Sequence, residues 1–265
     1  MLCGTDIGVM LQGKPLLQAA HLTAHPREIS VIIGPNGSGK TTLLRALTGE
    51  IAHSGQVLLN GADIRQQKNW ELAAVRAVLP QSTALAFPFT ALEVVRLGLT
   101  SGVHGADQTV PLDALEAVGL RHLADQFFQE LSGGEQQRVQ LARVLTQVWE
   151  PMHDGAPCWI FLDEPVASLD IAHQLLVMNL LRDFAKGGGG VVTILHDLNL
   201  TALYANSVTL LKKGRVAAYG RVAEVFNDSV LSDVYGCVLQ VNTVPQATVP
   251  FLLPHAAREH PRGSV

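Results

Sequence analysis

The sequence predicts an α/β protein in which buried parallel strands alternate with helices. Three apolar runs carry this prediction, at residues 29–33 (ISVII), 159–162 (WIFL) and 191–195 (VVTIL). Short runs of this kind are typical of parallel strands that are covered on both faces. Between the first two runs, roughly over residues 85–155, apolar residues recur at helical spacing instead. These residues are Leu112, Leu115, Val118 and Leu123, and then Val139, Ala142 and Leu145.

In order along the chain, the elements fall into three zones. The first zone, to about residue 84, is strand-rich, and its run 56–61 predicts a strand that ends in an Asn-Gly turn. A helical zone follows, and strands alternate with helices again from about residue 156. Residues 208–219 predict a hairpin. The four glycines at 187–190 predict a connector before the strand 191–195, either a flexible one or a plain loop.

Composition narrows the classes of function. The chain has 265 residues, of which 16% are charged, and a net charge of −4. This charge argues against nucleic acid as a partner, because phosphate backbones require a basic surface. No run approaches eighteen apolar residues, so no membrane span is expected, and the first residues do not resemble a secretory signal. Cys3, Cys158 and Cys237 are far apart and are expected to be reduced thiols.

A glycine-rich run follows the first predicted strand directly. Residues 34–41 read GPNGSGKT, which fits the pattern G-x-x-x-x-G-K-S/T. Its glycines allow successive N–H groups to turn towards one anion, and the following helix points its positive N-terminus there. Lys40 adds charge for the β- and γ-phosphates, and the Thr41 hydroxyl can bind Mg²⁺. The run predicts a site for a nucleoside triphosphate with Mg²⁺. The candidate phosphate-binding residues are Gly34, Pro35, Asn36, Gly37, Ser38, Gly39, Lys40, Thr41 and Thr42.

Two adjacent carboxylates close the predicted strand 159–162. Asp163 and Glu164 should therefore lie at the carboxyl edge of the sheet, where ligands bind in α/β proteins. Asp163 can hold Mg²⁺, since hard cations prefer carboxylate oxygens. Glu164 can orient or deprotonate an attacking water. His196 follows the strand 191–195 and is expected at the same edge.

A second helix with an exposed N-terminus is predicted to begin at Ser132. Ser132 and Glu135 form an S-x-x-E capping box, which predicts a helix that runs towards Val148. Gly133 and Gly134 inside the box leave room for a close approach to the backbone. Because helix N-termini attract phosphate, the chain carries a second phosphate-attracting site.

The order of these motifs resembles that of the ATP-binding-cassette (ABC) family over nearly the whole chain. The motifs are the phosphate loop, LSGGEQQR at 131–138, IFLDEP at 160–165 and SLD at 168–170. The resemblance implies a P-loop NTPase fold with a mixed central sheet, an N-terminal antiparallel β subdomain and an inserted helical subdomain. It assigns the nucleotide-binding core and the β subdomain to 1–84 and 156–241. The helical subdomain takes 85–155, and an extended C-terminal segment and tail take 242–265.

The resemblance also implies a head-to-tail homodimer that binds ATP and Mg²⁺. Each ATP would lie between the phosphate loop of one subunit and residues 132–134 of the other. The position that matches Gln81 senses Mg²⁺ and water and relays to the membrane partner. The position that matches His196 contacts the γ-phosphate, and the one that matches Asp170 communicates across the dimer. Glu164, His196 and Gln81 are therefore the candidate catalytic residues.

Two positions depart from the family pattern. The family usually stacks an aromatic ring on adenine near the N-terminus, but residues 9–13 contain none. Leu11 or Met10 is expected to pack against the base instead. Val166 replaces a common threonine, and little effect is expected from this change.

Within the family, the chain resembles the ATPases of iron-siderophore, cobalamin and heme importers. The stretch 85–90 (LAFPFT) resembles the heme importers in particular. Phe87, Pro88 and Phe89 are expected to form an apolar socket for a partner's helix. The alternative is that both phenylalanines fill the chain's own core.

The resemblance thus implies an ATPase subunit of a bacterial heme importer, at the cytoplasmic face of the inner membrane. A permease dimer would be its direct partner, and a periplasmic heme-binding protein an indirect one. Import of ferric siderophores or cobalamin stays open, as does a soluble ABC ATPase outside transport. Heme ligation by the ten scattered histidines is not expected.

Overall fold

The computed structural model describes residues 1–81, 87–101, 109–245 and 250–254. Residues 82–86, which include the first two residues of the stretch 85–90, and most of the predicted tail lie outside the described residues.

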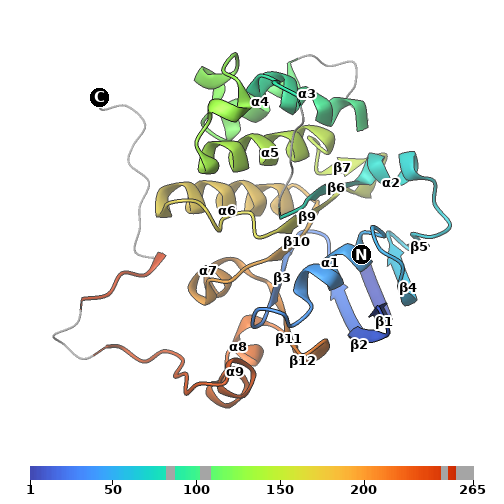
Figure 1. Ribbon diagram of the computed structural model, residues 1–265, viewed down its shortest axis with the longest axis vertical. Coiled ribbons are helices and arrows are strands. Elements are labelled where there is room, and N and C mark those ends of the chain that lie inside the picture. The colour runs from blue at the N-terminus through green and yellow to red at the C-terminus, as the bar shows by residue number, and fades with distance from the viewer. Residues whose placement is uncertain (82–86, 102–108, 246–249, 255–265) are drawn as a thin grey trace.

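A six-stranded sheet forms the centre of the molecule (Figure 1). Five of its strands are parallel, and β12 at one edge runs antiparallel to β11. The predicted mixed central sheet is confirmed. In spatial order the strands are β12 (Arg215–Gly220), β11 (Ser207–Lys212), β3 (Ile29–Ile33), β10 (Gly190–Ile194), β9 (Trp159–Asp163) and β6 (Arg76–Leu79). The strands β3, β9 and β10 are buried along their whole length, as their apolar runs predict.

A four-stranded antiparallel sheet from the N-terminal part lies beside the central one. Its order is β2 (Lys14–Ala24), β1 (Leu2–Leu11), β4 (Ser54–Leu59) and β5 (Ala62–Asp63). Asn60 and Gly61 join the last two with positive φ at both positions, as a tight hairpin turn requires. The helix α1 (Lys40–Leu47) packs in an apolar cluster with residues of both sheets, so this cluster fixes its direction.

Helices dominate the middle of the chain, as predicted. They are α3 (Ala91–Ser101), α4 (Val110–Ala117) and α5 (Gly133–Gln147), with 3₁₀ turns at Arg121–Leu123 and Phe128–Glu130. They lie together at one end of the molecule (Figure 1). The sequence did not indicate α2 (Asn69–Val75) or the small hairpin of β7 (Met152–His153) and β8 (Ala156–Pro157). The exact subdomain boundaries stay a prediction.

Among the described residues, the C-terminal part adds further helices to the central sheet. They are α6 (Ile171–Lys186), α7 (Leu198–Tyr204), α8 (Val222–Val225) and α9 (Asp228–Tyr235).

The predicted connector at 187–190 is a short turn that joins α6 to β10. Gly187 caps α6, and Gly190 is already the first residue of β10. A Cβ on Gly189 would overlap the ring of Phe184, and one on Gly190 would overlap the indole of Trp159. These glycines therefore allow a close packing of helix against strand.

Candidate active site

The candidate site lies where four neighbouring strands end. The phosphate loop follows β3, and Glu164 follows β9, whose last residue is Asp163. His196 follows β10 by two residues, and Gln81 follows β6 by two. Because these strands are parallel, their carboxyl ends meet at one edge and bring the four segments together.

The phosphate loop forms a cradle of backbone groups. Gly34, Gly37 and Gly39 have φ values of 147°, 76° and 102°, which favour residues without a Cβ. Lys40 Nζ donates to the carbonyl oxygen of Gly34 at 2.9 Å and to that of Pro35 at 3.1 Å. A cavity of about 470 Å³ opens beside the loop. It is lined by Leu16, Asn36, Gly37, Gly39, Lys40, Thr41, Thr42, Gln81, Glu164 and His196.

Asp163 and Thr41 fit a divalent cation. Asp163 is only 3% exposed, and its Oδ1 has no hydrogen-bond partner among the described residues. Burial raises the pKa of Asp163, although a side-chain hydrogen bond with Thr41 opposes the shift. A buried, unpartnered carboxylate oxygen next to a hydroxyl is a suitable donor set for Mg²⁺. Burial also lowers the pKa of Lys40, with the charges of Glu164 and Asp163 acting in the opposite direction.

Both carboxylate oxygens of Glu164 have a hydrogen-bond partner. Its Oε1 lies 2.5 Å from Nε2 of His196, and its Oε2 accepts from Nε2 of Gln81 at 3.3 Å. The side chain is 17% exposed, so solvent or a ligand can reach it. A fixed carboxylate at the mouth of the phosphate cavity can orient a water or accept its proton. The structure thus brings the three candidate catalytic residues into contact.

The capping box at Ser132 is present, as predicted. Ser132 N donates to Oε2 of Glu135 at 2.8 Å, and Glu135 N donates to Ser132 Oγ at 3.4 Å. These hydrogen bonds lower the pKa of Glu135. A Cβ on Gly133 would meet nothing within 4 Å, so the helix start is open. None of the residues 132–134 lines the cavity of the phosphate loop.

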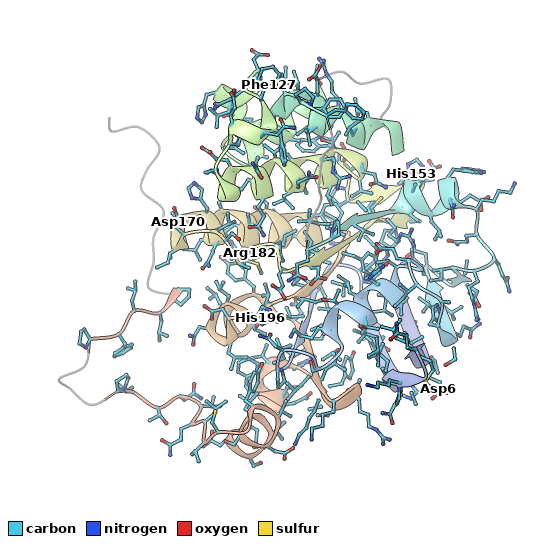
Figure 2. The ribbon with its side chains drawn as sticks, viewed as in Figure 1. Asp6, Phe127, His153, Asp170, Arg182 and His196 are labelled. Carbon is cyan, nitrogen blue, oxygen red and sulfur yellow. The ribbon has the colours of Figure 1, made fainter. Side chains whose placement is uncertain are left out.

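The other predicted site residues occupy separate places. Asp170 caps α6, and its Oδ1 accepts from His173 N at 2.9 Å. The Phe87 side chain is 67% exposed, whereas Phe89 packs partly into the core, so the two phenylalanines divide between the predicted alternatives. Figure 2 shows Phe127, which is also exposed, among the helices at the top and His196 near the central sheet.

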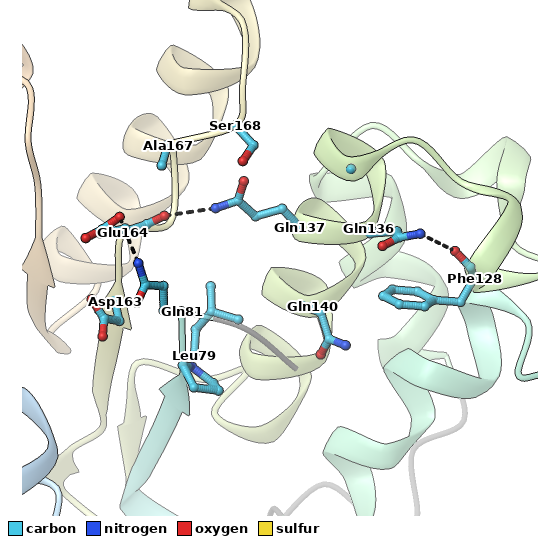
Figure 3. A pocket seen from close by; sticks show the side chains of 12 residues that line it. Leu79, Gln81, Phe128, Gln136, Gln137, Gln140, Asp163, Glu164, Ala167 and Ser168 are labelled. Atoms are coloured by element: carbon cyan, nitrogen blue, oxygen red, sulfur yellow. Dashed lines mark hydrogen bonds between the residues drawn. The ribbon is translucent and has the colours of Figure 1, made fainter. Parts of the chain in front are cut away.

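The structure also contains contacts that the sequence did not reveal. Leu16 of β2 lines the phosphate cavity, whereas Leu11 does not and is 57% exposed, so adenine packing by Leu11 stays a prediction. Gln137 of α5 donates from Nε2 to the carbonyl oxygen of Glu164 at 2.9 Å (Figure 3). Gln137 lies within the LSGGEQQR motif, but only the fold brings it to Glu164. No sequence pattern marks Leu16.

Comparison with known proteins gives a consistent result. The family model described as "ABC transporter" matches residues 17–167. The "Hemin import ATP-binding protein HmuV" of Jannaschia sp. (strain CCS1) is 56% identical over 97% of this chain and 96% of its own length. The protein of the same name from Roseobacter denitrificans (strain ATCC 33942 / OCh 114) is 57% identical over 95% of this chain and 97% of its own.

Solved structures show the same fold. The "Structure of ATP binding subunit of ABC transporter" matches with a TM-score of 0.76 at 20% identity, and covers 89% of this chain and 98% of that one. The ADP- and Pi-bound dimeric cassette MJ0796 matches with a TM-score of 0.73 at 26% identity, over 84% and 99%. Within the described part of the chain, none of the helices combines the length and the apolar character that crossing a membrane requires. From its motifs, its site and these matches, the chain belongs to the ABC transporter family as an ATP-binding protein.

Proposed function

We propose that this chain is the ATP-hydrolysing subunit of a bacterial hemin importer. The observation that carries the proposal is the contact of Glu164 with both His196 and Gln81 at the mouth of the phosphate cavity. This arrangement suits hydrolysis of ATP rather than binding alone. The cargo is inferred from relatives that are 56–57% identical over nearly the whole chain and are named as hemin import proteins.

The residues of the site have different roles in ATP hydrolysis. The backbone of residues 34–42 and the Lys40 ammonium hold the phosphates. Thr41, Asp163 and Gln81 would hold Mg²⁺, which neutralises charge on the β- and γ-phosphates when it is bound. Glu164 orients the attacking water and accepts its proton. His196 keeps the Glu164 carboxylate in place and contacts the γ-phosphate.

A second copy of the chain would complete each site. The open helix start at residues 132–134 attracts phosphate but does not line the chain's own phosphate cavity. A head-to-tail homodimer places it over the ATP of the partner, and Asp170 lies in the segment that faces the partner. ATP binds the closed dimer more tightly than the open one, and this difference supplies the work of transport.

The permease would dock on the helical end of the molecule, at the cytoplasmic face of the inner membrane. Phe87 is exposed beside Pro88, while Phe89 anchors the segment in the core. The exposed Phe127 lies next to this segment, because Thr90 pairs with Phe127 in a β-bridge. Phe87→Ser should weaken co-purification with the permease. Trp70→Ser is the matched control, since Trp70 is also 67% exposed but lies on α2, outside the segment of Phe87, Pro88 and Phe89.

Reconstitution in vesicles tests the cargo. The subunit, its permease and a periplasmic heme-binding protein are combined, and ATP hydrolysis is measured with and without heme. Heme-loaded binding protein should stimulate hydrolysis, whereas binding proteins loaded with a ferric siderophore or cobalamin should not. Stimulation by one of these other ligands alone would replace the cargo assignment. Failure to co-purify with any multi-span membrane protein would instead favour an ATPase outside transport.

A further inference from the structure

Glu164 is held by side chains from three different elements. His196 and Gln81 contact its carboxylate and follow strands of the central sheet. The third contact reaches its backbone: Nε2 of Gln137 donates to the Glu164 carbonyl oxygen at 2.9 Å (Figure 3). Gln137 lies on α5, so this contact joins the helical part of the chain to the backbone of the residue that carries the catalytic carboxylate.

The backbone of Glu164 requires such support. Its φ is 55°, in the left-handed region that residues with a Cβ seldom adopt. Conformations of this kind persist where the surroundings hold them. The Glu164 carbonyl oxygen also accepts from Ala167 N, but at 3.4 Å. The bond from Gln137 is the shorter of the two.

The stability of the fold alone does not explain a glutamine at position 137. Its Oε1 is buried and has no hydrogen-bond partner in the described part of the chain. The side chain lines a cavity of about 430 Å³ between α5 and the end of β9, together with Gln81, Gly133 and Gln140. A buried amide oxygen without a hydrogen-bond partner is costly, and an apolar side chain of the same shape would avoid this cost. A glutamine here therefore points to the bond with Glu164.

Gln137 is also linked rigidly to the open helix start. Ser132 caps α5, and Gln137 lies five residues later in the same helix, which continues to Gln147. A helix of this length moves as one body, because its backbone hydrogen bonds join successive turns. Any shift of residues 132–134 therefore moves Gln137 against the Glu164 carbonyl.

We propose that Gln137 is a positioning residue that couples the two ATP sites of the dimer. Residues 132–134 of one chain contact the ATP on the partner, and Gln137 of that chain sets the orientation of the chain's own Glu164. Occupation of one site thereby aligns the base of the other. The coupling rests on the head-to-tail dimer of the proposed function, whereas the positioning of Glu164 within one chain does not.

Single substitutions test the positioning. Gln137→Leu removes the donor and should lower kcat for ATP by about 10- to 100-fold, because a misplaced base loses alignment. KM for ATP should stay unchanged, since Gln137 does not line the phosphate cavity. Gln140→Leu is the matched control: Gln140 lines the same cavity, one turn further along α5, and should leave kcat unchanged. Thermal unfolding verifies that each variant is folded.

A pH series separates positioning from packing. Gln137→Glu keeps the shape of the side chain, but the ionised carboxylate cannot donate a hydrogen bond, whereas the protonated form can. Burial raises the pKa of such a carboxyl. The kcat of Gln137→Glu relative to wild type should therefore rise as the pH is lowered from neutrality. A ratio that does not change with pH, or a normal kcat in Gln137→Leu, would overturn the assignment.

Mixed dimers, isolated with two different affinity tags, test which of the two ATP sites each Gln137 serves. In trans, one chain carries Glu164→Gln and the other carries Gln137→Leu, so the only intact base lies in the chain without Gln137. In cis, both changes lie in one chain, and the partner keeps both Glu164 and Gln137. Positioning within the chain predicts lower activity in trans than in cis. If Gln137 instead served the partner's ATP through residues 132–134, activity would be lower in cis.

The failure of each hypothesis has its own signature. Recovery of no mixed dimer in the presence of Mg²⁺ and ATP would refute the dimer and with it the coupling. The single variants would then still decide whether Gln137 positions Glu164. Equal activity in cis and trans would overturn the proposed role of Gln137 while leaving the dimer intact.

Discussion

At the scale of single residues, two adjacent acids have different environments. Asp163 ends β9 with an oxygen that has no partner among the described residues, and burial raises its pKa. Glu164 is contacted at both oxygens, by His196 and Gln81. Neighbours in the sequence thus suit different purposes, a cation ligand and a general base.

Glu164→Gln should bind ATP normally but hydrolyse it roughly 10²- to 10⁴-fold more slowly. The substitution keeps the shape of the side chain and removes its ability to accept a proton. Nucleotide binding and steady-state hydrolysis, measured on the same preparation, give the two quantities. Near-normal turnover would show that Glu164 is not the base. Lys40→Ala is the contrasting variant, since it should weaken binding itself.

Asp163→Asn should raise the free energy of unfolding at neutral pH while hydrolysis that depends on Mg²⁺ is lost. The folded state raises the pKa of Asp163, so its ionised form lowers stability above that pKa. This penalty fades as the pH falls through the folded pKa towards the unfolded value of about 3.9. Urea unfolding of both proteins across this range checks the sign. A stability difference that grows on acidification would contradict it.

At the scale of elements, local patterns were sufficient for helix starts but not for close packing. The capping box of Ser132 and Glu135 predicts the start of α5, because both partners lie within four residues. The glycines at 187–190 indicate only a connector when the run is considered by itself. The side chains that Gly189 and Gly190 pack against, Phe184 and Trp159, lie outside the run. A composition rule cannot reveal a long-range contact of this kind.

Gly190→Ala should lower the free energy of unfolding by about 1–3 kcal/mol, because the added methyl group overlaps the indole of Trp159. Urea denaturation measures the loss. The same change in a Trp159→Leu background provides the control, since leucine lacks the ring atoms that a Cβ would meet. An equal loss in both backgrounds would show that the overlap is not the cause.

At the scale of the whole molecule, the fold brings the loops after four strands together at one cavity and leaves the start of α5 outside it. The ends of β3, β6, β9 and β10 form a single edge, and their loops supply the phosphate cavity. The start of α5 does not contribute to this cavity. The open helix start therefore has no place in the chain's own phosphate cavity, which is the basis of the proposed homodimer.

A mixture of Lys40→Ala and Ser132→Arg chains should trap nucleotide in one site per dimer, which neither variant does alone, while the empty second site keeps hydrolysis below that of the wild type. In a head-to-tail dimer, one of the two sites then combines an intact phosphate loop with an intact helix start. Hydrolysis and nucleotide trapped per dimer are measured for the mixture and for each parent. If neither quantity rises above the parents, the site does not lie between chains.

The sequence alone determined the ligand class, the family and the buried parallel strands of the central sheet. These properties depend on local patterns: the glycine run before Lys40, the acids after an apolar strand, and the capping box at Ser132. Each is complete within a few residues, so no knowledge of the fold is needed to recognise it.

The tertiary structure decided which side chains meet. It places Leu16 rather than Leu11 at the phosphate cavity, leaves Phe87 exposed while Phe89 is packed, and brings Gln137 to Glu164. Such contacts join residues far apart in the chain, and they depend on strand order and helix packing. Strand order and helix packing cannot be predicted from any single stretch of sequence, because both arise only when the two sheets and the helices pack together.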